Sequence, residues 1–450
     1  MEQERIRPRS TGRSARGRYV LYWMQASQRA SWNHALQYAV DEADRKGRPV
    51  LVLFCLIPDY PEANLRHYAF MLEGLAETGR DLADRGAGFV VEVGSPPEVV
   101  ASYGARAALV VTDCGYLHHQ RLWRRQVAER LERPFVEVET DVVVPVEAAY
   151  PKQAVSAAVL RRRIRPALDR FLTPMEEKAP RVRFSGGDFP SSVPLDVEGL
   201  LGRLVVDRSV PTVPLGSGNR AARQALQRFL DERLERYAEE RNDPGRDVCS
   251  GLSPYLHFGQ LSPLEAAWEA SRRGGAGAEA FLEERVVRRE LAVNAVYYNP
   301  AYDAWEGLPA WARDTLSRHA RDPRPALYSR EELEAARTED PAWNAAQREL
   351  VHFGKIHGYM RMYWGRQLLL WTRNPREAFR VGLYLNNKYA LDGRDPSSYV
   401  GVAWCLGLHD RPFKERPIFG QVRSMTPQGL RRKLDLTVYL EKTSHLPSRA

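Results

Sequence analysis

Two apolar runs, RYVLYWM at residues 18–24 and RPVLVLFCL at residues 48–56, decide the fold of this 450-residue chain. Both are rich in β-branched and aromatic residues, as expected for buried strands. Three similar runs follow at 88–94, 108–113 and 135–140, and helical stretches such as 65–86 and 119–131 lie between them. Because strands that alternate with helices form parallel sheets, the sequence predicts a doubly wound, Rossmann-like α/β domain.

The second half of the chain has a different pattern. Residues 146–218 are rich in Pro, Gly and Ser, as in SVPTVPLGSGN, which indicates an inter-domain connector. After residue 219 apolar side chains recur at helical spacing, as in RAARQALQRFLDERLERY. We therefore expect four parts, namely a disordered basic arm (1–17), the α/β domain (18–145), the connector (146–218) and an all-helical domain (219–450).

The composition narrows the class of protein but does not identify a partner. The chain has 66 Lys and Arg against 57 Asp and Glu, a net charge of +9. This surplus favours a polyanionic partner, although charge alone leaves nucleic acid undecided. The four cysteines form no CxxC pair, so we expect reduced thiols in a cytoplasmic protein. No apolar run reaches the ~18 residues that a membrane span needs.

Common catalytic motifs are missing from the sequence. It contains no Walker loop, no GxSxG and no GxGxxG after the first strand, so hydrolytic chemistry and a dinucleotide site in the α/β half lack support. The sequence does not exclude a crevice for a small ligand at the carboxyl ends of the strands. His352 and His357 would point about 140° apart on a helix, and we expect no metal site.

The tryptophans of the second half allow two interpretations. Trp364 and Trp371 lie seven residues apart in MRMYWGRQLLLW, so on a helix they share a face with a rise of ~10.5 Å. Packing in a core explains this spacing, and a redox role explains it as well. Seven of the ten tryptophans belong to this half, namely Trp268, Trp305, Trp311, Trp343, Trp364, Trp371 and Trp404.

Several motifs taken in order are more specific than any one of them. They are LSPYLHFGQLSP, EERVVRREL, YYNPAYDAWEG, DPAWNAAQREL, HGYMRMYW, LNNKYALDGRDPSSYVGVAW and HDRPFKERPIFGQVR. Together they resemble the class II cyclobutane pyrimidine dimer photolyases of the photolyase/cryptochrome superfamily. The resemblance begins at YWMQASQRASWNHAL near the first strand and is most specific over 237–425. It implies an α/β antenna domain, a connector and a helical flavin domain.

The resemblance implies light-driven repair of double-stranded DNA with reduced FAD as the cofactor. The dimer would be flipped out of the duplex beside the flavin and split by an electron from it. The matching FAD positions near the phosphates are Tyr237, Ser250, Gly251, Leu252 and Ser253, and those around the ring system are Arg361, Asp392 and Asn386, the last near its N5 atom. The resemblance also suggests a deazaflavin-type antenna chromophore in the α/β half, without placing its contacts.

The resemblance also assigns a lesion side. Glu284 matches a carboxyl group that hydrogen-bonds the dimer, and the other matching positions are Met362 and Trp404 against the thymines and Arg241, Asn242 and Arg423 on the DNA. Phe413 occupies the place of a Trp that helps fill the gap left by the flipped dimer. The sequence departs from the family pattern at two further places. Arg288 stands where some relatives have a Trp that stacks on the substrate, and the segment CLGL at 405–408 is one residue shorter than in the usual family pattern.

The same resemblance favours the redox interpretation for two indoles. Trp364 and Trp343 match a pair that passes an electron to oxidised FAD, and a role for Trp371 in extending or branching this path is left open. The alternative function is a cryptochrome-type flavin photoreceptor without repair activity. Repair of the (6-4) lesion fits less well, because the histidines of this chain do not match that pattern. We expect a monomer that does not bind membranes.

Overall fold

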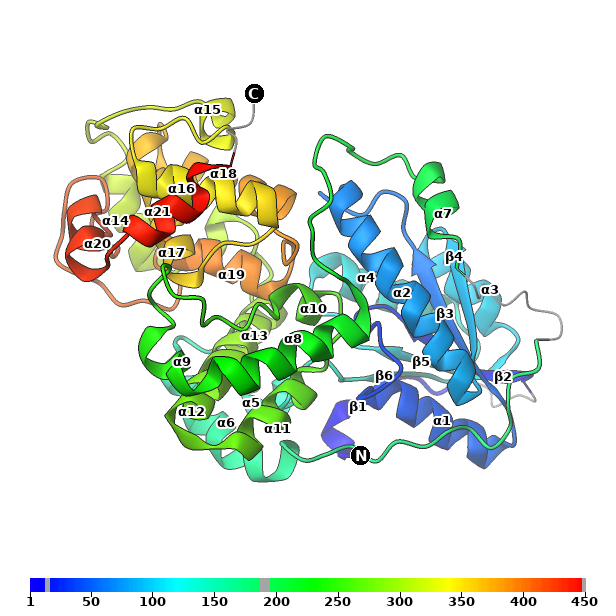
Figure 1. Cartoon of the computed structure of the whole chain (residues 1–450). Coiled ribbons are helices and arrows are strands. Elements are labelled where there is room, and N and C mark those ends of the chain that lie inside the picture. Colours follow the sequence, from blue (N-terminus) through cyan, green and yellow to red (C-terminus); the bar gives the residue numbers. More distant parts are fainter. Residues whose placement is uncertain (13–16, 187–194, 447–450) are drawn as a thin grey trace. The chain divides into compact units, whose positions relative to one another are not determined.

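The chain folds into two compact units in the computed structural model, which describes residues 1–12, 17–186 and 195–446. The first unit comprises residues 1–151, 162–228 and 251–273, and the second comprises 152–161, 229–250 and 274–450. Figure 1 shows strands with flanking helices in the first unit and helices in the second. The predicted combination of an α/β part with an all-helical part is confirmed.

A six-stranded sheet forms the centre of the first unit. Its strands are β1 (Ile6–Ser10), β2 (Tyr19–Met24), β3 (Val50–Leu56), β4 (Gly88–Val93), β5 (Ala107–Asp113) and β6 (Phe135–Val138). The spatial order is β1-β6-β5-β2-β3-β4, and all neighbours are parallel except β1 and β6. The chain runs outward from β2 in both directions, so the topological switch point lies between β2 and β5. All five strands expected from the sequence are present.

Alternate residues of β2 supply two separate cores, because side chains of a strand point to opposite faces. Val20, Tyr22 and Met24 pack with α1 (His34–Lys46) and α2 (Leu65–Arg85), while Tyr19, Leu21 and Trp23 pack with α3 (Pro96–Gly104) and α4 (His118–Arg130). Every residue of β2 is buried. Burial of both faces explains why this strand is a continuous apolar run.

The prediction of a disordered basic arm over residues 1–17 is wrong for residues 1–12, and residues 13–16 lie outside the described residues. A short 3₁₀ helix, η1 (Gln3–Arg5), leads into β1, which pairs with β6. Arg5 is fully buried and donates to the carbonyls of Glu139, Val142 and Val143. Arginine-rich composition suggested a solvated arm, whereas tertiary contacts supply the acceptors that bury it.

The segment expected to connect the domains contains helices. They are α5 (Val146–Ala149), α6 (Ala157–Phe171) and α7 (Val197–Arg203), followed by α8 (Gly218–Glu232). Residues 162–228 belong to the first compact unit, as do α10 (Ser253–His257) and α11 (Pro263–Arg273). The expected boundary at residue 219 is therefore not where the two units divide.

The second unit is built around α17 (Gly358–Trp371), which packs against α16 (Pro341–Phe353), α18 (Pro375–Tyr389) and α19 (Pro396–Cys405). Helices α16, α18 and α19 each begin with a proline, and the residue before it caps the helix with its side chain. These caps are Asp340, Asn374 and Asp395, and this combination is common at helix starts. The other elements are α9 (Leu234–Glu240), α12 (Gly275–Leu282), η2 (Glu283–Arg288), α13 (Arg289–Tyr298), η3 (Trp305–Gly307), α14 (Ala310–Arg318), α15 (Arg330–Glu334), α20 (Pro427–Lys433) and α21 (Thr437–Ser444).

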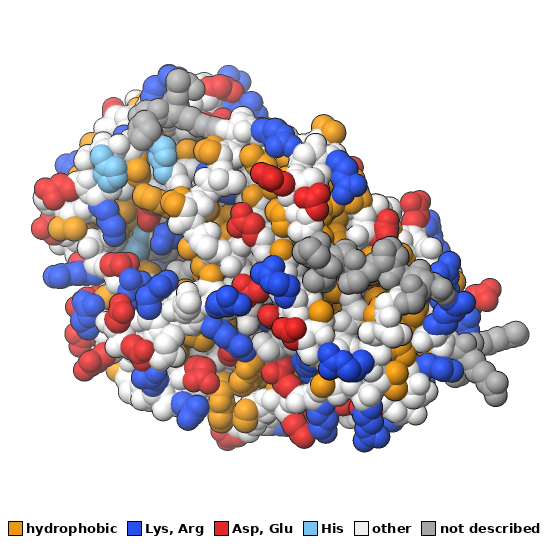
Figure 2. Space-filling view, turned by 45° about the vertical axis from the view of Figure 1, so that its right-hand side comes forward, with side chains coloured by type: hydrophobic (Ala, Val, Ile, Leu, Met, Phe, Trp, Pro, Cys, Tyr) orange, Lys and Arg blue, Asp and Glu red, His pale blue; other side chains and the backbone are white. Residues whose placement is uncertain are grey.

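The face of the molecule drawn in Figure 2 does not by itself reveal a DNA-binding surface. On the face drawn in Figure 2, Lys and Arg side chains are interspersed with Asp and Glu. Among the described residues, none of the helices combines the length and the apolar character needed to cross a bilayer. A DNA-binding region must therefore be argued from particular residues rather than from the net charge.

Candidate active site

Three indoles form a continuous row in the second unit. Trp343 of α16 stacks on Trp364 of α17, with ring centroids 6.2 Å apart and planes 6° apart. Trp371, at the end of α17, meets Trp343 edge-on, with centroids 5.5 Å apart and planes at 82°. The three side chains are 0%, 1% and 3% exposed in the order 343, 364, 371. The order in space is therefore Trp364, Trp343, Trp371, although Trp364 and Trp371 share a helix.

Hydrogen bonds fix the first two rings. The Trp343 Nε1–H donates to the backbone carbonyl of Trp364 at 2.9 Å, and the Trp364 Nε1–H donates to Oε1 of Gln347 at 2.9 Å. Gln347 is itself fully buried. Buried indoles usually need such partners for their N–H groups. Both rings are thereby held in one orientation.

Tyr328 extends the row of rings and was not identified from the sequence. Its ring meets Trp371 edge-on, with centroids 5.6 Å apart and planes at 88°. Its backbone N–H donates to the Trp371 carbonyl at 3.1 Å. Unlike the three indoles, Tyr328 is partly exposed. No local pattern joins residues so far apart in the chain, so only the folded structure could reveal this contact.

Asn386 of α18 is a buried polar group that lacks part of its hydrogen bonding. The side chain is 1% exposed, and its Nδ2 has no hydrogen-bond partner among the described residues. A buried amide left unpaired costs about 1–3 kcal/mol, so such groups in native proteins call for an explanation. A bound acceptor is one explanation, and it matches the FAD position that the sequence implied for Asn386.

Arg361 and Asp392, the other predicted ring-flanking residues, form an ion pair. The Arg361 NH2 lies 3.2 Å and 3.3 Å from the two carboxylate oxygens of Asp392. Their side chains keep 18% and 11% exposure. Asp392 follows α18, and its carbonyl accepts a hydrogen bond from the Ser398 hydroxyl at 2.6 Å. The structure brings these two predicted residues together.

The predicted phosphate-binding positions are divided between the two units. Tyr237 and Ser250 belong to the second unit, where both are buried and the Ser250 hydroxyl accepts from Arg285 at 3.3 Å. Gly251, Leu252 and Ser253 belong to the first unit. Gly251 has a φ of +68°, which favours glycine. Ser253 begins α10.

The predicted lesion-side carboxylate lies on an unusual element. Glu284 is part of η2, a π-helix over Glu283–Arg288 that continues α12 into α13. Its Oε1 accepts from NH1 of Arg241 at 2.7 Å, and both side chains are 27% exposed. Short π-helices occur frequently at functional sites. A ligand that binds this carboxylate would compete with Arg241 for it.

The remaining lesion-side positions are accessible. Met362 and Trp404 are partly exposed, and the Trp404 ring meets the edge of His409 with centroids 5.5 Å apart. Arg423 is exposed and lies over the Phe413 ring, 5.8 Å from its centroid. Asn242 is exposed, next to Arg241 in the chain. Each of these residues can therefore be reached from solvent.

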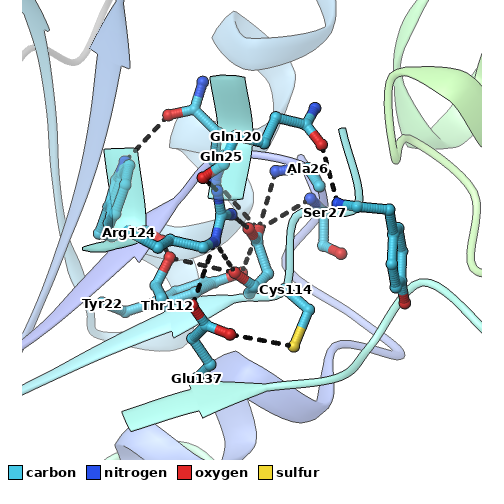
Figure 3. Close-up of polar contacts among 12 residues, drawn as sticks. Tyr22, Gln25, Ala26, Ser27, Thr112, Cys114, Gln120, Arg124 and Glu137 are labelled. Atoms are coloured by element: carbon cyan, nitrogen blue, oxygen red, sulfur yellow. Dashed lines mark hydrogen bonds and ion pairs between the residues drawn. The ribbon is translucent and has the colours of Figure 1, made fainter. Parts of the chain in front are cut away.

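A second polar cluster lies in the α/β unit, at the carboxyl end of β5 near the switch point. Oδ2 of Asp113 accepts from the backbone amides of Gln25, Ala26 and Ser27 at 3.0, 2.9 and 3.0 Å. Its Oδ1 accepts from Arg124 at 2.9 Å. Figure 3 shows these donors converging, with Thr112, Cys114 and Glu137 beside them. A protein carboxylate thus satisfies the loop amides that could otherwise bind an anionic ligand.

Comparison with known proteins identifies the family. The family model described as DNA photolyase matches residues 20–181. A deoxyribodipyrimidine photo-lyase of Methanothermobacter thermautotrophicus is 45% identical, over 95% of each chain. The chain belongs to the DNA photolyase family. Another deoxyribodipyrimidine photo-lyase, from Potorous tridactylus, is 40% identical over 94% of this chain and 81% of its own.

A solved photolyase structure agrees with this fold. The archaeal photolyase from Sulfolobus tokodaii, described with two FAD molecules, matches with a TM-score of 0.72 and 18% identity, over 95% of this chain and 90% of its own. At this identity the likeness concerns the fold only. The full-length relatives confirm the predicted family, with light-dependent repair of cyclobutane pyrimidine dimers as its activity.

Proposed function

We propose that this photolyase binds FAD in its helical unit, with Asn386, Arg361 and Asp392 around the flavin ring system. The orphaned Nδ2 of Asn386 supports this, because a buried donor needs an acceptor that the described residues do not supply. Bound reduced FAD would supply an electron to the dimer on illumination. The residues present therefore fit the cofactor, with Tyr237 and Ser250 proposed toward its phosphates and the segment 251–253 following them in the chain.

The row of rings is the observation that carries the redox part of this proposal. We infer that Trp364, Trp343 and Trp371 pass electrons inward when the cofactor has been oxidised. Centroid separations of 6.2 Å and 5.5 Å lie within the range of interacting aromatic pairs, about 4.5–7 Å. The hydrogen bonds from both inner indoles keep this contact fixed. Partly exposed Tyr328 offers an outer end to the row.

On the lesion side, Glu284 is proposed to accept a hydrogen bond from the flipped dimer, and Met362 and Trp404 to pack against it. The partly exposed Glu284–Arg241 pair supports this role, because such a pair can exchange partners at low cost. Arg241, Asn242, Arg423 and Phe413 are proposed to contact double-stranded DNA around the lesion. The monomeric state and cytoplasmic location expected from the sequence stay predictions.

An antenna chromophore in the α/β unit is a further part of the proposal. A partly exposed ring cluster, Tyr60, His119 and Trp123, follows the carboxyl ends of β3 and β5. The His119 and Trp123 centroids are 4.9 Å apart, and Nε2 of His119 lies 2.7 Å from the Tyr60 hydroxyl. Such rings suit a flat conjugated ligand of the deazaflavin type. An absorption band beyond that of FAD, released on denaturation, would support it.

The decisive experiment measures repair directly. The purified protein should carry a flavin absorption spectrum. Mixed in its reduced form with an oligonucleotide that contains a thymine dimer, it should restore absorbance at the thymine band under blue light and not in the dark. A protein without bound flavin, or without light-dependent recovery, would contradict the proposal. A flavoprotein that lacks repair would favour the cryptochrome-type alternative.

Two variants separate the proposed roles. E284Q should lower repair per absorbed photon and leave light-driven reduction of FAD intact, because it changes the lesion side only. W364F should lose light-driven reduction and keep repair once FAD is reduced chemically. If both variants lost both activities, the separation into a lesion side and an electron path would be wrong.

A further inference from the structure

The π-helix η2 brings together two residues that an α-helix would separate. Glu283 and Arg288 are five positions apart, which on an α-helix corresponds to about 140° around the axis. In η2 the Arg288 Nε lies 3.3 Å from Oε1 of Glu283. The wider turn therefore aligns an acidic and a basic side chain on the element that also carries Glu284.

Glu283 is held from its other side by Arg161 of α6. The Arg161 Nε and NH2 donate to Oε2 and Oε1 of Glu283 at 2.8 Å and 2.5 Å, a bidentate contact. Burial alone would raise the pKa of Glu283, but the hydrogen bond from Arg161 and the charges of both arginines outweigh it and lower the pKa. Two guanidinium groups and one carboxylate leave this trio with a net charge of +1.

Arg288 also covers part of the Trp404 ring, with its Cζ 5.4 Å from the ring centroid. Its side chain is 37% exposed, and its terminal nitrogens have no hydrogen bond to any residue that the structure describes. A guanidinium over an aromatic ring keeps its N–H groups in its own plane, where they can still donate. Glu283 and Trp404 thus fix the position of Arg288, while its terminal N–H groups can donate to a ligand.

Stability does not account for this arrangement. Ion pairs between partly exposed side chains contribute little to the free energy of folding. The neighbouring pair Arg241 and Glu284 has no net charge, whereas the trio Arg161, Glu283 and Arg288 is positive. The excess charge borders Trp404, which is itself partly exposed.

We propose that Arg288 binds an oxygen acceptor of the flipped-out pyrimidine dimer, and that Glu283 and Arg161 position it beside Trp404. This inference rests on the proposed dimer-binding role of the helical unit. The acceptor is a phosphate oxygen or a ring carbonyl of the lesion, because both accept from a planar pair of N–H donors. An aromatic side chain at this position could stack on the lesion but could not neutralise charge.

The test compares R288Q with a matched arginine variant, R376Q. Arg376 also lies over an indole, 5.2 Å from the Trp305 centroid, and pairs with Glu306 at 2.8 Å. Binding of the FAD-loaded enzyme to DNA with one thymine dimer, and to undamaged DNA, is measured over a range of salt concentrations. R288Q should weaken lesion binding about tenfold, and R376Q should not change it.

Two further binding measurements distinguish a phosphate acceptor from a carbonyl acceptor. Binding of a thymine-dimer dinucleotide is compared with binding of a base dimer that has no phosphate. With a phosphate acceptor, R288Q weakens only the dinucleotide and lowers the salt slope by about 1. With a carbonyl acceptor, it weakens both ligands. E283Q should shift lesion binding in the same direction by a smaller factor, since it releases Arg288 without removing it.

Light-driven reduction of FAD serves as the check that each variant is folded. If R288Q bound lesion DNA with wild-type affinity and salt slope, the proposed role of Arg288 would be wrong. The proposed repair function would not be affected by this result. If the wild-type enzyme did not distinguish lesion DNA from undamaged DNA, the proposed function itself would fail, and this inference with it.

Discussion

The charged cluster around Asp113 and the charged cluster around Glu284 differ in how their polar atoms are satisfied. Asp113 is fully buried, and both of its oxygens accept hydrogen bonds within the α/β unit. Glu284 and Arg241 are each 27% exposed, and in the same helical unit the buried Nδ2 of Asn386 has no partner among the described residues. Saturated buried charges stabilise a fold, whereas accessible or unsaturated groups are available to ligands.

The Asp113 cluster shows that shifted pKa values do not by themselves identify an active site. The Asp113 cluster has charges of both signs, a thiol and a tyrosine, and burial raises the pKa of Cys114 and of Tyr22 well above their ordinary values. Perturbed pKa values alone would nominate it as an active site. Both carboxylate oxygens of Asp113 are hydrogen-bonded within the unit, which argues instead for a structural role of this residue that mutation can test against the helical site.

The largest effect is expected from W364F on light-driven reduction of FAD. Phenylalanine is harder to oxidise than tryptophan and cannot donate to Gln347. The reduction rate should fall more than about 100-fold, equivalent to ~3 kcal/mol in a barrier. Absorbance of oxidised flavin under steady illumination measures this. The control is W305F, since Trp305 is buried in η3 and is not one of the rings that form the row. Normal light-driven reduction in W364F would contradict the proposed electron path.

The next effect concerns stability of the α/β unit. D113A removes the acceptor of three backbone amides and of Arg124, and leaves a buried guanidinium with less compensation. We expect the free energy of unfolding to fall by about 3–5 kcal/mol, measured by urea denaturation. E42Q, which breaks the surface pair of Glu42 with Arg45, should cost less than about 1 kcal/mol. Equal costs for the two variants would contradict the structural role.

A smaller effect is expected from pH in the helical unit. Burial lowers the pKa of His409 to about 4, partly opposed by its hydrogen bond with the Val155 carbonyl. Between pH 6.5 and pH 4 the unfolded chain binds a proton there that the folded chain does not, so stability present above pH 6.5 is lost as the pH falls. H409N, which tolerates the φ of +61°, should reduce this loss by about 2–3 kcal/mol.

Urea denaturation at pH 7 and at pH 4.5 measures this difference. Another buried histidine, His34 in the α/β unit, also has a lowered pKa because of burial, so part of the acid sensitivity should persist in H409N. An unchanged pH dependence in H409N would show that folding does not lower the pKa of His409.

The smallest effect on stability is expected from a substitution of Asn386. N386L replaces the orphaned amide by an apolar group of similar size, so the flavin-free protein should change in stability by less than about 1 kcal/mol. FAD retention should nevertheless fall, as measured by flavin absorbance after gel filtration. A large loss of stability without loss of FAD would place Asn386 with Asp113, among the structural residues.

How far the sequence predicted this protein depended on whether a feature was local. Strands β2 to β6 were identified because apolar runs mark buried strands, and β1 was missed because an arginine-rich segment gives no such signal. The motif order indicated the family. The positions of Trp343 and Trp364 were recognised, but their stacking depends on the packing of α16 against α17.

The sequence by itself determined the alternation of strands and helices, the helical second half and the membership of the photolyase family, since each is encoded by residues near one another in the chain. The tertiary structure decided the antiparallel edge strand, the contact of Tyr328 with Trp371 and the alignment of Arg288 with Glu283 and Trp404. These depend on side chains from separate elements, whose approach is fixed by packing and by the π-helix.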